Sequence, residues 1–273
     1  MNYRKLTLRS LTKHAVMLAL SLFAVFPFYW MIISSFRTEA EMYSSALWPK
    51  HWTWDNYADV WRMIPMLDML GNSTAMSVAQ TFFQLGTAIL AAYAFSRWTF
   101  PGSRVLFLMF ALTWLIPFQV TMIPNYVTIS AWGWRNTLQG LIAPNLVSAF
   151  AIISMTQSFK AFPKGITEAA LLDGASSWSI LWRMYVPNMK ASIASLGILL
   201  FINSWNEYFW PLLLTNKLEN TVIQIGLQMF MSSDGNAWGP LMAAAVITSV
   251  PILAVYLMLQ RQIVDSFVKM GLK

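Results

Sequence analysis

Six stretches of about 20 predominantly apolar residues run through the sequence, and no other feature limits the possible fold as strongly. A helix of that length is what a polypeptide needs to cross the hydrocarbon core of a bilayer. The predicted spans are His14–Ser34, Ser73–Phe95, Val105–Ile129, Leu138–Gln157, Ala191–Leu214 and Pro240–Leu259. Only 11% of the 273 residues are charged, whereas soluble domains carry about 25%. The sequence therefore predicts an all-α integral membrane protein with six transmembrane helices.

The third predicted span contains two prolines, Pro117 and Pro124. Proline removes a hydrogen-bond donor, and it is tolerated in a span where neighbouring groups satisfy the freed carbonyls. We expect a kink or a break there.

Basic residues alternate between the segments that join the spans. Thirteen of the 18 Lys and Arg residues lie before the first span or after the second, fourth and sixth, and five lie in the other loops. Cytoplasmic segments carry such an excess. Residues 1–13 and the tail 261–273 are thus predicted to be cytoplasmic, and 35–72 to form an extracytoplasmic loop with short surface helices. The net charge of +7 is then explained by topology, without nucleic acid.

The first span also resembles a secretory signal, because it follows a basic start. It is too long for the apolar region of a signal peptide and has no small-residue cleavage site followed by a polar mature domain. A retained membrane anchor is the preferred interpretation.

Several kinds of chemistry are excluded by residues that the sequence lacks. There is no cysteine, and no GxxxxGK[ST] loop that would bind a nucleotide phosphate. The two histidines, His14 and His51, lie at a span end and in a loop, which argues against an intramembrane protease. Glu207 is the one acid inside a span, whereas ion-coupled carriers usually keep several ionisable groups there. An ion-coupled secondary carrier remains the alternative function.

The loop 158–190, between the fourth and fifth spans, is longer than a helix–helix connection requires. It is predicted to form two short helices. The first starts at Pro163 and ends at Gly174; the second is capped by Ser176 or Ser177 and stopped by Pro187. From the residues alone, a docking helix for another protein and a helix lying on the membrane surface remain equally open.

The run Glu168-Ala169-Ala170-Leu171-Leu172-Asp173-Gly174-Ala175, followed by Val186-Pro187, resembles the EAA signature of type I ABC importer permeases. The resemblance implies the MetI-like permease fold, with a core at 73–260 and the loop 158–190 as coupling helices. It also implies that the loop docks on a separate ATPase, which uses ATP and Mg, so that the chain itself binds no cofactor or metal and is not an enzyme. The implied docking residues are Glu168, Ala169, Ala170, Asp173 and Gly174.

Further stretches are similar to the carbohydrate-uptake branch of this family, of the maltose and glycerol-3-phosphate type. They are Asn72-Ser73, Ala91–Arg97, Phe100-Pro101-Gly102 and Ser204–Leu212. This likeness implies a permease of the bacterial cytoplasmic (inner) membrane that moves a sugar, oligosaccharide, polyol or glycerol phosphate by alternating access. The implied partners are a homologous second permease in a heterodimer, two ATP-binding subunits and an extracytoplasmic solute-binding protein.

A polar stripe in the fifth span suggests where a solute passes. Asn203, Asn206, Glu207 and Trp210 have the spacing of one helical face, and such a stripe is costly in hydrocarbon unless it faces protein or water. Gln119 and Asn145, in the third and fourth spans, complete the predicted pathway. Because amides also join transmembrane helices, helix packing is an open alternative.

Overall fold

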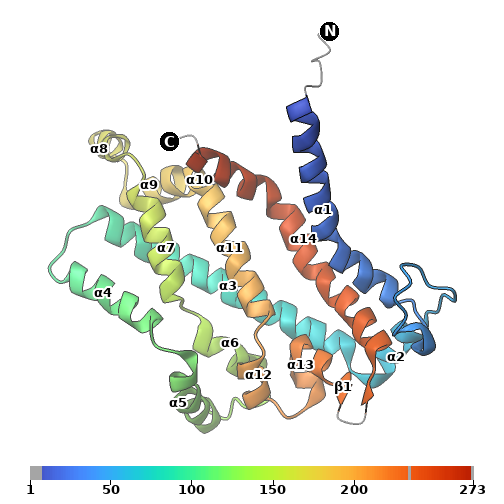
Figure 1. Cartoon of the computed structure of the whole chain (residues 1–273). Coiled ribbons are helices and arrows are strands. Elements are labelled where there is room, and N and C mark those ends of the chain that lie inside the picture. The colour runs from blue at the N-terminus through green and yellow to red at the C-terminus, as the bar shows by residue number, and fades with distance from the viewer. Residues whose placement is uncertain (1–7, 233–234, 272–273) are drawn as a thin grey trace. The chain divides into compact units, whose positions relative to one another are not determined.

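Long apolar helices make up most of the computed structural model, which describes residues 8–232 and 235–271 (Figure 1). Three helical stretches are long and apolar enough to cross a membrane: Ser10–Ser34, Met66–Arg97 and Trp238–Gln262. Three bent helix pairs qualify as broken spans, which brings the number to six. The prediction of an all-helical membrane protein with six spans is therefore confirmed, and half of the spans are interrupted.

The sharpest interruption lies in the third span. Helices α4 (Ser103–Trp114) and α5 (Phe118–Ala131) meet at 93°, and Pro117 is the last residue of the break. This confirms the predicted break and assigns it to Pro117, since Pro124 lies inside α5.

The fourth span is also broken. The segment Leu138–Asn145, made of α6 (Leu138–Ile142) and the 3₁₀ turn η2 (Ala143–Asn145), meets α7 (Ala149–Lys160) at 46°. Pro144 lies in that 3₁₀ turn. Ala143, before the proline, keeps helical geometry, and the chain leaves the helix only after Asn145.

The chain divides into two compact units. The first comprises residues 8–64 and the described part of 227–249. It contains α1 (Leu8–Ser34), η1 (Glu39–Glu41), α2 (Asp55–Met63), the two-residue antiparallel strands β1 (Met231–Ser232) and β2 (Gly235–Asn236), and the start of α14 (Trp238–Gly271). The short helices η1 and α2 match those expected in the loop 35–72, although α3 already begins at Met66.

Arg37 organises the segment that follows α1. Its side chain is buried, its guanidinium donates to the carbonyls of Ser44 (2.7 Å), Glu41 (3.4 Å) and Ala46, and it lies 4.5 Å from the ring centre of Trp30. A buried charge is costly unless it is hydrogen-bonded. These carbonyls therefore hold the loop closed around the guanidinium.

A second contact ties the two ends of this loop. His51 lies 2.8 Å from a carboxylate oxygen of Glu41, and the backbone N–H groups of Lys50 and His51 donate to the same carboxylate. The His51 side-chain hydrogen bond, ahead of the backbone ones, holds the pKa of Glu41 below its ordinary value.

The second unit comprises residues 65–226 and 250–271. Besides α4 to α7, it contains α3 (Met66–Arg97), α8 (Lys164–Leu172), α9 (Ser177–Ile180), the π turn η3 (Leu181–Tyr185), α10 (Val186–Asn188), α11 (Lys190–Trp205), α12 (Phe209–Leu214), η4 (Leu218–Asn220) and the first four residues of α13 (Ile223–Gln228). Its main core joins α3, α7 and α11 through buried side chains that include Ala88, Ala92, Met155 and Leu200. Small residues on α3 allow the helices to approach closely.

Some predictions fall on residues that the structure does not describe. Residues 1–7 of the N-terminal segment 1–13 and residues 272–273 of the tail 261–273 lie outside the described chain.

Candidate functional site

The loop 158–190 forms the two helices predicted from the sequence. The first is α8, whose N-cap is Pro163, and it lies beyond one end of the bundle in the second unit (Figure 1). At its C-terminus, the N–H of Gly174 donates to the carbonyl of Leu171 (3.0 Å) and the N–H of Ala175 to that of Ala170 (2.9 Å). Gly174 has a φ of 79°. These are the features of a Schellman motif, in which glycine supplies the left-handed residue that ends a helix.

The second helix begins where predicted and ends one residue later than predicted. The Ser176 hydroxyl accepts a hydrogen bond from the N–H of Ser179, so Ser176 is the cap. The helix passes through the π turn η3 and continues beyond Pro187 to Asn188. In the π turn, the N–H of Val186 donates to the carbonyl of Leu181, five residues earlier. The stretch Ser177–Asn188 then meets Lys190–Leu214 at 78°.

Most of the predicted docking residues lie at the surface of α8. Glu168, Ala169, Asp173 and Gly174 are exposed, whereas Ala170 is half-buried and packs against the main core. Three apolar side chains near these residues are also exposed: Ile166, Leu171 and Leu172. Leu172 is 90% exposed. Exposed apolar side chains gathered on one element are typical of a protein or membrane contact, so α8 is suited to either a docking partner or the membrane surface.

A polar cavity of about 430 Å³ lies among α3, the broken third and fourth spans, and α11. Its lining consists of amides, hydroxyls, one carboxylate and aromatic rings. The lining residues are Gln80, Gln84, Trp114, Phe118, Asn145, Ser148, Phe150, Leu200, Asn203, Ser204 and Glu207. Volumes of this order hold small-molecule ligands.

Two glutamines of α3 tie the cavity to the break in the fourth span. Gln80 donates to the carbonyl of Leu141 (3.1 Å) and accepts from the hydroxyl of Ser204 (2.7 Å). Gln84 donates to the carbonyl of Asn145 (2.6 Å). These carbonyls lie at a helix break and would otherwise lack partners. Neither glutamine was predicted as a site residue, although their i, i+4 spacing in an apolar span is the same signal that singled out the fifth span.

The structure brings three of the six predicted pathway residues together. Asn145, Asn203 and Glu207 line the cavity, with Leu200, Asn203, Ser204 and Glu207 forming the face contributed by the fifth span. The expected continuous face through Asn206 and Trp210 is wrong, because α11 ends at Trp205 and α12 begins at Phe209.

The other three predicted residues lie elsewhere. Asn206 is exposed and accepts a hydrogen bond from the side chain of Gln224 (3.2 Å). Trp210 is fully buried, and its indole donates to the carbonyl of Gly140 (3.1 Å). Gln119 is exposed on α5 and does not line the cavity. Trp210 therefore packs helices together.

Glu207, the one acid inside a predicted span, has a structural partner as well as a place in the cavity. One of its carboxylate oxygens accepts the backbone N–H of Trp210 (3.1 Å) in the first turn of α12. A negative charge is favourable at that end of a helix. This contact explains how a carboxylate is retained at the break.

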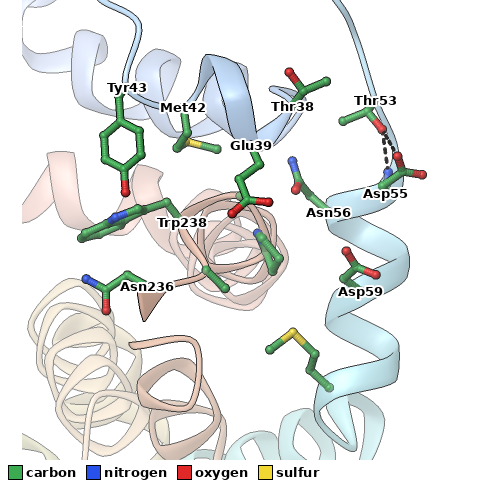
Figure 2. A pocket seen from close by; sticks show the side chains of 14 residues that line it. Thr38, Glu39, Met42, Tyr43, Thr53, Asp55, Asn56, Asp59, Asn236 and Trp238 are labelled. Carbon is green, nitrogen blue, oxygen red and sulfur yellow. Dashed lines mark hydrogen bonds between the residues drawn. The ribbon is translucent and has the colours of Figure 1, made fainter. Parts of the chain in front are cut away.

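The first unit has a separate pocket of about 380 Å³, which Figure 2 shows. Glu39 of η1 and Asp55 and Asp59 of α2 contribute its carboxylates, together with Tyr43 and Trp238. Asp55 accepts from the hydroxyl of Thr53 (2.7 Å), and Asp59 pairs with Arg62 at 3.3 Å. Two of the three acids thus have local partners. In the described part of the chain, no three His, Cys, Asp or Glu side chains, these acids included, are grouped so that they could hold a metal ion.

Comparison with known proteins places these features in a family. The family described as "Binding-protein-dependent transport system inner membrane component" matches residues 84–269. The diacetylchitobiose uptake system permease protein NgcG of Streptomyces coelicolor is 29% identical over 258 residues, which cover 93% of this chain and 85% of that protein. The sn-glycerol-3-phosphate transport system permease protein UgpE of Pectobacterium atrosepticum is 33% identical over 264 residues, covering 93% and 94%.

A solved structure has the same fold. It is a bacterial ABC transporter involved in the import of the acidic polysaccharide alginate, and its matching chain is 23% identical with a TM-score of 0.78. The match covers 96% of this chain and 98% of that one.

Proposed function

The chain belongs to the family of inner membrane components of binding-protein-dependent transport systems, and we propose that it moves a carbohydrate or a related solute inward as one permease of a heterodimeric ABC importer. The relatives named for diacetylchitobiose and glycerol phosphate support this solute class. The partners are a second, homologous permease, two ATP-binding subunits and an extracytoplasmic solute-binding protein. Both termini and the loop 158–190 lie on the cytoplasmic side.

The exposed helix α8 is the single observation that carries the proposal. It presents Glu168, Ala169, Asp173 and Gly174 outward with the side chain of Leu172, and a capped second helix supports it. Such a surface fits a cleft on an ATP-binding subunit. The chain has no phosphate-binding GxxxxGK[ST] loop, so the proposal assigns ATP hydrolysis to the partner subunits.

Transport then proceeds by alternating access. ATP binding closes the ATPase dimer, the two docked permease loops move with it, and the spans change from inward-open to outward-open. Solute is released from the binding protein into a pathway to which this chain contributes the cavity at Asn145, Asn203 and Glu207. The buried Trp210 holds the adjacent helix break.

Reconstitution tests the proposal. The chain, its partner permease and the ATP-binding subunits are purified together and placed in proteoliposomes, and ATP hydrolysis is measured with and without the solute-binding protein. We expect the binding protein to stimulate hydrolysis several-fold. Uptake that requires an ion gradient, stops with a protonophore and continues without ATP would instead identify an ion-coupled carrier.

A further inference from the structure

The charge of the cavity lining limits which solutes can enter it. Glu207 is the one ionisable residue among the lining residues, and no lysine, arginine or histidine of the described chain lines the cavity. We propose that this cavity accepts uncharged polyhydroxylated solutes and rejects phosphates and uronates, with Glu207 as the specificity-determining residue. This inference rests on the proposed function. It narrows the proposed solute class to its uncharged members.

Free hydrogen-bonding groups face the cavity from two spans. Within the described chain, the side-chain amides of Asn145 and Asn203 make no hydrogen bond, and only one carboxylate oxygen of Glu207 is engaged. An amide offers both donors and an acceptor, and a carboxylate offers acceptors. Sugar hydroxyls donate and accept, so they can satisfy all three groups at once.

Aromatic rings also line the cavity. Trp114 and Phe150 have ring centres 5.6 Å apart, and Phe118 is a third aromatic residue of the lining. An aromatic ring offers an apolar face of fixed shape, against which the C–H face of a pyranose can stack. Apolar walls with a few placed polar groups are the usual composition of a small-molecule site.

The same lining opposes an anion. Repulsion between two negative charges about 6 Å apart, at an effective dielectric constant of about 20, weakens the binding of an anionic solute roughly a hundredfold. A phosphate or carboxylate beside Glu207 would meet this repulsion with no cationic side chain in the lining to offset it. A neutral sugar of similar size would not.

The test compares two disaccharides that differ in charge. The complete importer, without its binding protein, is placed in nanodiscs, and equilibrium retention of radiolabelled N,N′-diacetylchitobiose and of dimannuronate is measured. We expect at least tenfold stronger retention of the neutral probe. Glu207→Gln keeps an oxygen that can accept from Trp210 and removes the charge, so it should strengthen dimannuronate binding until the ratio is below about threefold.

Glu219→Gln is the matched control, because it removes one charge from an exposed acid of η4 outside the cavity. It should keep the parent ratio. Equal binding of the two probes to the parent, an unchanged ratio in Glu207→Gln, or no retention of either probe would each overturn the inference. ATP hydrolysis, measured on the same nanodiscs before and after the binding protein is added, separates the two proposals: stimulation without probe retention rejects only the cavity, whereas absence of stimulation rejects the importer.

Discussion

The side chain of Gln84 donates a 2.6 Å hydrogen bond to the backbone carbonyl of Asn145, across the break in the fourth span. One turn earlier on α3, Gln80 bonds the carbonyl of Leu141 and the hydroxyl of Ser204. Two amides of one helix thus provide partners for carbonyls at a break in another. The cavity lies at the break in the fourth span, and these amides bond carbonyls at the break, as an interrupted helix in a membrane requires.

Gln80→Leu tests this network. The substitution leaves the carbonyl of Leu141 and the hydroxyl of Ser204 without their partner, and an unsatisfied buried polar group costs about 1–3 kcal/mol. We expect a loss of stability of about 2 kcal/mol, measured by thermal unfolding of the purified importer in detergent. Gln157→Leu, at an exposed position of α7, should change stability little. Equal effects of the two substitutions would contradict the role of the network.

Gly140→Ala tests the packing beneath Trp210. A Cβ at Gly140 would overlap the backbone carbonyl oxygen of Trp134 and lie 2.9 Å from a methyl carbon of Leu214. Overpacking of this kind costs about 1–3 kcal/mol. Gly86→Ala is the matched control, since nothing lies within 4 Å of its Cβ position in α3; there, alanine should be neutral or stabilise by about 0.5–1 kcal/mol. The measurement is the urea midpoint of each variant, and an unchanged midpoint for Gly140→Ala would argue against close packing.

Gly174→Asp tests the coupling loop. A residue with a Cβ in the left-handed region costs about 1–2 kcal/mol, and the new carboxylate adds charge to the exposed end of α8. We expect normal membrane insertion and complex assembly, with ATP-driven uptake reduced at least tenfold. Gly133→Asp is the control because Gly133 also has a positive φ and open space around it, outside the loop 158–190. Full uptake by the Gly174→Asp variant would contradict the assignment of α8 as the helix that docks on the ATPase.

The contact between His51 and Glu41 predicts a pH dependence. Because this hydrogen bond lowers the folded-state pKa of Glu41, its contribution to stability is present above the unfolded-state pKa and is lost as pH falls through the folded-state pKa. The effect is small, since the His51 side chain is largely exposed to solvent, which screens the contact. Hydrogen exchange of residues 36–54 should be faster in His51→Ala than in the parent at neutral pH, and the difference should vanish in acid. A difference that persists in acid would assign the effect to something other than this carboxylate.

Long apolar runs made the number of spans predictable, and Pro117 made one break predictable. Pro211 was the signal for the break at residues 206–208, because a proline cannot bond the carbonyl four residues earlier, that of Glu207, and its ring clashes with it in a continuous helix; the predicted single helical face ignored this signal. Without that break, helical spacing places Asn206 and Trp210 beside Asn203. In the structure, Asn206 bonds Gln224 and Trp210 bonds the carbonyl of Gly140 instead.

The coupling loop was more predictable than the cavity because its signals are local. Gly174 ends α8 and Ser176 caps the following helix, and both depend on only a few neighbouring residues. The cavity depends on contacts between residues far apart in sequence, such as Gln80 with Ser204. The spacing of Gln80 and Gln84 was visible in the sequence, but their partners were not.

The bend of 78° between Ser177–Asn188 and Lys190–Leu214 has a mechanical consequence. Helix α11 begins at the bend, and Asn203 lies about 20 Å along it at 1.5 Å per residue. A rotation of about 10° at the bend would therefore shift Asn203 sideways by about 3 Å, roughly the length of one hydrogen bond. With α8 docked on the ATPase and the solute pathway at Asn203 as proposed, a small angular displacement at this bend is enough to make or break contacts with the solute at the far end of α11.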